Sequence, residues 1–354
     1  MPGLKYPSLN GLRALSILFV ILSHIQHQLA FVPGSVTFFK YVSFLVDGQL
    51  GVNVFFVISG FLITNLLLHE EAKTGEISLK NFYIRRILRI FPAYYFLLLV
   101  YFVFQLFHYI DIPHRAWVTA VTYTKYFNWK VDYFTAHAWS LSIEEHFYLL
   151  WPLFLSISHR SRKYFLYIIV ILCPLIRIYY WVFNPDLSWI NSLTIFQRFD
   201  SIAFGCLAAL YQEKLTGFVL KNKKWLLLLT IPWFLIYPLV TIANLRYNMN
   251  IEWIIAPLAG SIGTVTNAAI TIIMLISVYY TRGIWFKFLN IKIMDQIGVL
   301  SYSLYLWQQF FTSDVSVGKH IFPFNVILIF LAAIFSYNII EKPFLKLKGK
   351  FAAK

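Results

Sequence analysis

The amino-acid sequence predicts an all-α protein, a polytopic transmembrane helical bundle of about ten spans. Of its 354 residues, 59% are hydrophobic and 13% are charged, and the mean hydropathy is +0.67. Soluble domains carry about 25% charged residues, so this chain is too apolar for that class. The formal charge of +15 falls in short clusters between apolar runs. That distribution indicates membrane topology and argues against nucleic-acid binding.

Ten apolar runs are close in length to the roughly 20 residues that a helix needs to cross the hydrocarbon core. Of the 30 lysines and arginines, 21 lie in the chain ends and loops on one side of the predicted membrane and 6 lie on the other. The positive-inside rule therefore predicts that both chain ends are cytoplasmic. The predicted spans are 9–30, 50–68, 92–110, 139–157, 164–183, 195–211, 224–242, 253–280, 297–312 and 322–340.

The loops between these spans are short except for 69–91 inside and 111–138 outside. We therefore expect a single integral membrane domain over residues 1–354, with no separate soluble domain. Segment 77–91, ISLKNFYIRRILRIF, sets three arginines against apolar side chains at helical spacing. This pattern predicts a basic helix at the cytoplasmic surface that runs into the third span.

The first span, LNGLRALSILFVILSH, contains Arg13 near its beginning and His24 near its end. Eleven helical positions rotate by about 1100°, roughly 20° beyond three turns, so both residues share one face. Arginine facing lipid costs about 2.5–3.5 kcal/mol, which predicts that this face points into the bundle. Two alternatives stay open. For Arg13, the alternative is that its side chain snorkels to lipid headgroups. For His24, the alternative is a structural histidine bonded to a neighbouring helix.

Two other spans carry polar side chains on one face of an otherwise apolar helix. The stripes are Ser140, Glu144 and Tyr148 in the fourth span, HAWSLSIEEHFYLLWP, and Ser301, Tyr305 and Gln308 in the ninth, GVLSYSLYLWQQ. Glu144 is expected to face the interior, whereas Glu145 and His146 are expected to be solvated near the outer surface. The alternative for the ninth span is hydrogen bonding that only holds helices together.

The second span offers Asn53, Ser59 and Gly60, small or polar residues that permit close approach of a backbone or a ligand. In the sixth span, QRFDSIAFG places Arg198 and Asp200 near the outer end.

Arg177, at the end of the fifth span, is expected at a depth similar to that of Arg198 and Asp200, so a purely structural ion pair is the alternative to a functional role. The two cysteines, Cys173 and Cys206, lie in apolar runs and predict neither a disulfide nor a metal site.

Six motifs in the same order resemble those of the acyltransferase-three family, polytopic membrane O-acyltransferases of bacteria. The resemblance covers nearly the whole chain. It implies transfer of an acyl group, usually acetyl, from cytoplasmic acyl-CoA to a hydroxyl of an extracytoplasmic or lipid-linked acceptor, often a sugar. It also implies a multi-pass protein of the bacterial inner (plasma) membrane without a permanently bound cofactor. The motifs are LNGLRALSILFVILSH, GVNVFFVISGFLIT, FYIRRILRIFPAYY, AWSLSIEEHFYLLWP, RFDSIAFG and GVLSYSLYLW.

Matched to these motifs, His24 is implied as the essential catalytic residue and Glu144 occupies the acidic position of the fourth span. Arg86 and Arg89 are implied in donor contact. Many relatives have histidine where this chain has Gln308, which puts a proton-transfer role there in doubt. Some relatives also append an extracytoplasmic hydrolase-like domain. We expect none here, which suggests action alone or with a separate partner.

We therefore expect Arg13, Arg86 and Arg89 to hold the donor phosphates at the cytoplasmic face, while the pantetheine arm threads inward to His24. His24 acts as a general base or forms an acyl-histidine, two routes that the sequence leaves open. Glu144 is expected to take part in catalysis by orienting the other ring nitrogen of His24. The acceptor is a glycan or lipid-linked sugar whose identity is also open. The residues expected to line the acceptor path or pore are Asn53, Ser59, Ser140, Tyr148, Arg198, Asp200, Ser301, Tyr305 and Gln308.

The main alternative is a transporter or flippase in which His24, Glu144 and Asp200 relay protons or engage cargo. A glycan polymerase or ligase should concentrate its arginines on the outer face, where only 6 of the 30 basic residues lie.

Overall fold

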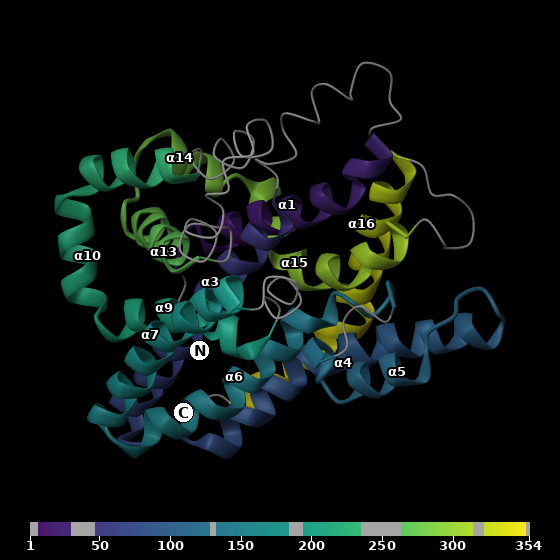
Figure 1. Cartoon of the computed structure of the whole chain (residues 1–354), viewed down its shortest axis with the longest axis horizontal. Helices are drawn as coiled ribbons and strands as arrows, with labels where there is room; N and C mark the ends of the chain where they lie inside the picture. The colour runs from purple at the N-terminus through teal and green to yellow at the C-terminus, as the bar shows by residue number, and fades with distance from the viewer. Residues whose placement is uncertain are drawn as a thin grey trace.

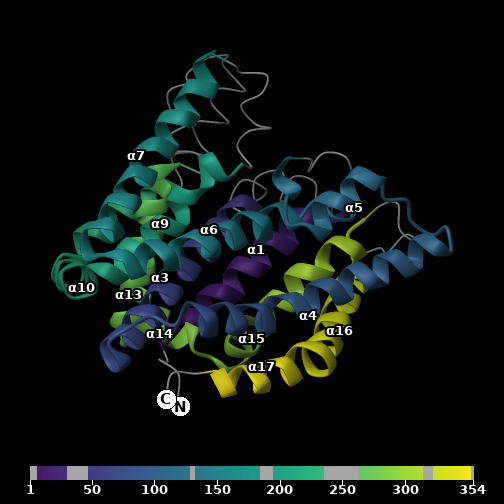
Figure 2. The same cartoon turned by 90° about the horizontal axis from the view of Figure 1, so that it is seen from below.

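The computed structural model describes residues 6–29, 47–127, 132–183, 194–234, 263–313 and 322–351. Within those ranges the chain forms helices joined by turns, and no strand occurs. The all-α prediction is confirmed for this part of the chain, and Figures 1 and 2 show the helices gathered into one bundle.

Most predicted spans coincide with a helix. The fourth span, predicted at 139–157, is α6, and the second and sixth are α3 and α9. The predicted spans 224–242 and 253–280 lie partly outside the described residues, which are helical at 223–234 and 264–279. The helices are α1 (Leu9–Leu29), α3 (Gly48–Thr74), α4 (Leu79–Leu106), α5 (His114–Val121), α6 (Ala138–Ile157), α7 (His159–Phe183), α9 (Ile195–Leu210), α10 (Gln212–Lys221), α13 (Thr264–Tyr279), α14 (Gly283–Leu289), α15 (Lys292–Phe311), α16 (Phe324–Ser336) and α17 (Lys342–Lys348).

Within the described ranges, four helices are long and apolar enough to cross a membrane. They are α3, α4, the Arg160–Tyr180 part of α7 and the continuous helix Phe324–Phe351 that contains α16 and α17. The pair α13 and α14 is a fifth candidate, although it bends by 88°. This finding indicates a multi-pass membrane protein, whereas the predicted count of about ten spans and the cytoplasmic chain ends stay predictions.

The basic segment and the third span form one continuous helix, as predicted. Ser78 begins α4 as its N-cap, because its hydroxyl accepts a hydrogen bond from the backbone N–H of Asn81 at 3.4 Å. Helix α4 continues through Pro92 and ends at Leu106, four residues before the predicted end of the span. The arginines of segment 77–91 are therefore rigidly connected to a long apolar helix.

Glycine allows α3 and α9 to pack with their backbones in contact. A Cβ atom on Gly60 would lie 2.0 Å from the carbonyl oxygen of Ile202, and one on Gly205 would lie 2.0 Å from that of Val57. Either side chain would force the helices apart, so the close approach expected at Gly60 is confirmed. The two cysteines are buried and free, as expected.

Helix α1 lies in the middle of the bundle and packs against α3 and α15 (Figure 2). The beginnings of α1 and α15 lie together, since Asn10 Nδ2 donates to Asp295 Oδ1 at 2.8 Å. Helix α17 follows a π-helical turn at Tyr337–Glu341 and packs along α4. One end of the bundle therefore gathers the beginnings of α1 and α4 with the end of the C-terminal helix, and we call it the basic end.

Candidate active site

A cavity lies between α1, α3, α4, α6 and α15, with about 670 Å³ of empty space including its open mouth. One part of its wall is cationic, and the rest is apolar or carries hydroxyl groups. The lining residues are Arg13, Val52, Phe55, Phe56, Ser59, Arg86, Arg89, Ile90, Ser140, Leu141, Glu144, Ser301, Tyr302 and Tyr305.

The cationic part of the cavity combines arginines from two helices. Arg13 comes from the second turn of α1, and Arg86 and Arg89 come from the basic part of α4. Arg13 and Arg89 make no hydrogen bond or salt bridge to any other described residue, and the two like charges repel each other. The structure thus brings together the three arginines that the sequence assigned to the donor.

Arg86 is the arginine that the protein itself holds in place. Its guanidinium carbon lies 3.6 Å from the ring centre of Tyr148, and its nitrogens lie 3.7 Å from carboxylate oxygens of Glu144 and Glu145. Tyr148 in turn donates a hydrogen bond to Glu144. A cation stacked on an aromatic ring and flanked by carboxylates has little rotational freedom. Arg86 is therefore oriented before any ligand binds.

Glu145 does not face solvent, which corrects the expectation from the sequence. Its side chain is 16% exposed, and its Oε1 atom is buried beside Arg86. His146 is also partly buried, with Nδ1 at 2.7 Å from the carbonyl oxygen of Ser142. The spacing of polar residues in the sequence did not predict this burial. The buried face of α6 is wider than the single stripe of residues spaced by four.

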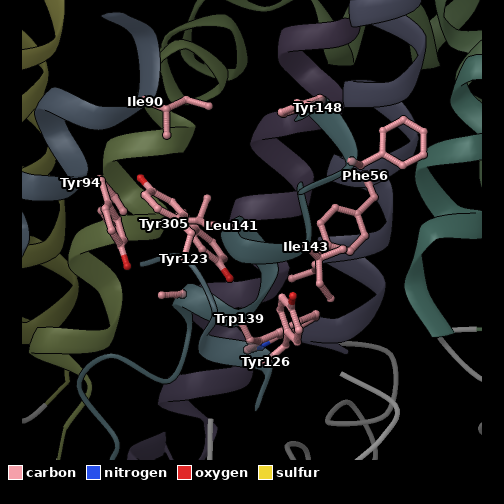
Figure 3. Close-up of a cluster of buried hydrophobic side chains, with 14 of the residues drawn as sticks. Phe56, Ile90, Tyr94, Tyr123, Tyr126, Trp139, Leu141, Ile143, Tyr148 and Tyr305 are labelled. Atoms are coloured by element: carbon pink, nitrogen blue, oxygen red, sulfur yellow. The ribbon is translucent and has the colours of Figure 1, made fainter. Parts of the chain in front are cut away.

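Two of the residues that line the cavity, one on α6 and one on α15, are joined by a hydrogen bond. The hydroxyl oxygens of Ser140 and Tyr305 lie 2.5 Å apart, and the Tyr305 hydroxyl also donates to the His137 carbonyl oxygen at 2.9 Å. Figure 3 shows Tyr305 beside Leu141 in the cluster that surrounds this contact. Polar side chains predicted on two separate helices therefore meet at one point.

His24 is not among the residues that line the cavity. Its Nδ1 atom lies 2.7 Å from the Val20 carbonyl oxygen, which can only accept, so Nδ1 carries a proton. His24 is electrostatically coupled to His137, whose ring packs 5.7 Å from that of Tyr305. Burial, and to a smaller extent His24, lower the pKa of His137, which precedes α6, to about 3. His24 thus interacts with a residue that also accepts a hydrogen bond from Tyr305.

Glu144 does not hold a ring nitrogen of His24. Its contacts are Tyr148 and Arg86, and the Nδ1 atom of His24 is already bonded to the backbone. The structure places Glu144 with the arginines of the cavity.

A second polar network lies apart from the lining of the cavity. Arg177 and Asp200 form a fully buried ion pair, with Nη2 of Arg177 at 2.6 Å from Oδ2 of Asp200. Arg198 Nη1 donates to Asn53 Oδ1 at 2.8 Å, and Asn53 donates to Asn267 at 3.2 Å. The polar residues of the second and sixth spans therefore connect α3, α7, α9 and α13.

Gln308 also lies outside the cavity lining. It is fully buried, and its Nε2 donates to Oε1 of Gln309 at 3.2 Å.

Two polar residues near the cavity were missed by sequence reasoning. Tyr302 lines the cavity and donates to the Ile90 carbonyl oxygen at 2.8 Å. Glu341, in the π-helical turn, accepts a hydrogen bond from Ser303 at 2.9 Å and attracts Arg89. The signal for Glu341 was a carboxylate at the end of a long apolar run. The sequence carried no such signal for Tyr302, because Tyr302 does not lie on the helix face formed by Ser301 and Tyr305.

Comparisons with known proteins identify the family of this chain. Residues 6–339 match the family model of the acyltransferase-three domain, which is described as an acyltransferase domain. The chain is 30% identical over 367 residues to O-acetyltransferase OatA of Staphylococcus aureus strain NCTC 8325, and the match covers 96% of this chain and 57% of that protein. It is also 30% identical over 379 residues to a putative O-acetyltransferase of Staphylococcus aureus strain COL, with the same coverage of 96% and 57%.

The chain thus spans 57% of the length of these curated relatives. No solved structure matches it. The family model covers nearly all of the chain, including every residue that lines the cavity. The protein therefore belongs to the acyltransferase-three family.

Proposed function

We propose that this protein is an O-acyltransferase of the bacterial inner membrane. It moves an acyl group, most simply acetyl, from cytoplasmic acyl-CoA to a hydroxyl of an extracytoplasmic or lipid-linked glycan. The observation that carries this proposal is the cavity whose wall combines Arg13, Arg86 and Arg89 with hydroxyl groups, among them those of Ser140 and Tyr305. The O-acetyltransferases to which the chain is similar support the same reaction class.

The chemistry of the donor fits the lining of this cavity. Coenzyme A carries its phosphates at one end and its thioester at the end of a long flexible arm. Guanidinium groups bind phosphate oxygens through paired hydrogen bonds, and Arg13 and Arg89 make no such bonds within the described residues. With the phosphates at the basic end, the arm extends along the cavity toward Ser140 and Tyr305. This orientation requires the basic end to be cytoplasmic, in agreement with the positive-inside rule.

In the proposed reaction, His24 removes the proton of the acceptor hydroxyl as the oxygen attacks the thioester carbonyl carbon. The carbon–sulfur bond then breaks, and the thiolate of coenzyme A leaves and takes up the proton. The Nδ1–H donated to Val20 leaves the lone pair of the neutral ring on Nε2. His24 follows Arg13 by eleven helical positions, a rise of about 16 Å along α1. Phosphates held at Arg13 would therefore keep the thioester at a fixed distance along the same helix.

Ser140 and Tyr305 line the cavity and His24 does not, so in this proposal the acyl group passes the Ser140–Tyr305 contact to reach His24. We propose that the side chain of Tyr305 moves when the donor binds. Rotation of one tyrosine breaks two hydrogen bonds, each of which contributes only about 1 kcal/mol.

The test is transfer of radiolabelled acetyl from acetyl-CoA by the full-length protein in membranes. We expect label in glycan material only in membranes that contain the protein, and release of one coenzyme A for each acetyl transferred. A transporter would move its cargo without consuming acetyl-CoA. Label transfer that did not depend on the protein would overturn the proposal. Mass spectrometry of surface glycans with and without the protein would then identify the acceptor by its acetyl mass difference.

A further inference from the structure

Lys348 of α17 lies at the basic end but was not assigned to any site by the sequence. It makes no hydrogen bond or salt bridge to another described residue. Instead it lies in the repulsive field of four arginines, of which Arg89 acts most strongly, followed by Arg86, Arg85 and Arg13. Like charges that are partly removed from water destabilise one another unless an anion lies between them.

The C-terminal helix is fastened in this position. Arg85 Nη1 donates to the Phe351 carbonyl oxygen at 2.7 Å, while Nη2 of the same side chain is paired with Glu70 Oε2 at 2.6 Å. Helix α17 packs along α4, as Figure 2 shows. Lys348 is therefore held beside the arginines by contacts made elsewhere on the helix.

Lys348 differs from its neighbours on the same helix. Lys342, Lys346 and Lys350 are exposed, whereas Lys348 is partly buried. A lysine that served only solubility or membrane attachment would be expected to remain in water with the other three. The partial burial of Lys348 and its charge interaction with Arg89 and Arg86 indicate a role in the same site.

We propose that Lys348 binds the phosphate group on the ribose of the acyl-CoA donor, the 3′-phosphate. This inference rests on the proposed function and extends the donor site to the C-terminal helix. Arg13, Arg86 and Arg89 line the cavity, whereas Lys348 lies outside the lining, on the helix whose last turn is bonded to Arg85. The diphosphate of coenzyme A lies nearer to the pantetheine arm than the nucleotide end does. The arginines then bind the diphosphate, and Lys348 binds the phosphate beyond it.

The test compares two donors that differ by this one phosphate. Affinities of purified full-length protein for acetyl-CoA and for 3′-dephospho acetyl-CoA are measured in nanodiscs of neutral phosphatidylcholine, with Lys348→Gln and the matched exposed control Lys346→Gln. We expect Lys348→Gln to weaken acetyl-CoA binding about tenfold, the usual effect of losing one charge-assisted hydrogen bond. Binding of the dephospho donor should not change, Lys346→Gln should bind both donors as the wild type does, and Lys348→Arg should restore acetyl-CoA binding.

Three results would overturn the inference. In the first, Lys348→Gln binds both donors as the wild type does. In the second, it weakens both equally, which would indicate a structural role or a diphosphate contact. In the third, its effect appears only in nanodiscs that contain anionic phosphatidylglycerol and is the same for both donors, which would assign Lys348 to lipid headgroups. A wild-type protein that bound neither donor would overturn the proposed function, and this inference with it.

Discussion

The hydroxyl oxygens of Ser140 and Tyr305 lie 2.5 Å apart and join α6 to α15 in the wall of the arginine-lined cavity. The same Tyr305 hydroxyl donates to the backbone of His137, whose ring interacts electrostatically with His24. The Ser140–Tyr305 contact thus links the proposed donor cavity to the surroundings of the predicted catalytic histidine. If acyl transfer takes place at His24, this contact controls passage between them.

Substituting Tyr305→Phe tests this relationship. The variant keeps the ring but loses hydrogen bonds that contribute about 1 kcal/mol each, so we expect kcat to change about fivefold in either direction. Donor affinity should rise, because donor binding to the variant no longer has to break the hydrogen bonds of the Tyr305 hydroxyl. The control is Tyr95→Phe, which loses one hydrogen bond to the Val121 carbonyl oxygen outside the cavity. An unaltered kcat for Tyr305→Phe would show that the Tyr305 hydroxyl does not control passage of the acyl group.

Replacing His24 with alanine should abolish acyl transfer. General-base catalysis contributes about 10² to 10⁴-fold, so the remaining rate should be smaller by that factor. Binding of acetyl-CoA should persist, since the phosphates are held at the other end of α1, and membrane insertion should also persist. His69→Ala, an exposed position on α3, is the control for loss of an imidazole. A fully active His24→Ala protein would remove this residue from the mechanism.

Substituting Arg89→Gln should weaken donor binding without destabilising the fold. A phosphate contact from a charged donor is worth about 1.5–3 kcal/mol, so the donor KM should rise about tenfold or more. Arg89 makes no hydrogen bond or salt bridge to a described residue, and its charge repels Arg13. The thermal unfolding midpoint in detergent should therefore stay the same or rise. Arg115→Gln, at an exposed position of α5, should change neither quantity. An unchanged KM in the Arg89 variant would require the phosphate site to lie elsewhere.

The buried ion pair of Arg177 and Asp200 should stabilise the fold. Removing one partner leaves an uncompensated buried charge, which costs about 3–5 kcal/mol, whereas replacing both with apolar residues is often neutral. We expect Asp200→Leu to lower the unfolding midpoint strongly and the double variant Arg177→Met, Asp200→Leu to recover most of the loss. Activity of the recovered double variant should approach that of the wild type. A stable but inactive double variant would instead support the functional role expected for Asp200 from the sequence.

Sequence reasoning found the arginines, because each of them interrupts or precedes an apolar run where a charge is costly. Arg13, Arg86 and Arg89 come from two helices and meet in one cavity. The same reasoning also grouped Asn53, Arg198 and Asp200 with the pore, whereas the structure places them in a network outside the cavity lining. Periodicity reports which face of a helix is polar, but it does not report which neighbour that face meets.

Composition, charge asymmetry and helical period by themselves determined the all-α class, the placement of most helices and the polar faces of α1, α6 and α15. These are local properties, since the cost of a charge in an apolar run and the 3.6-residue turn act within one segment. Only the tertiary structure decided that Glu145 lies beside Arg86, that Tyr305 meets Ser140 in the cavity wall, and that Lys348 returns to the basic end. Those contacts join residues far apart in the chain, and their geometry depends on how the helices cross.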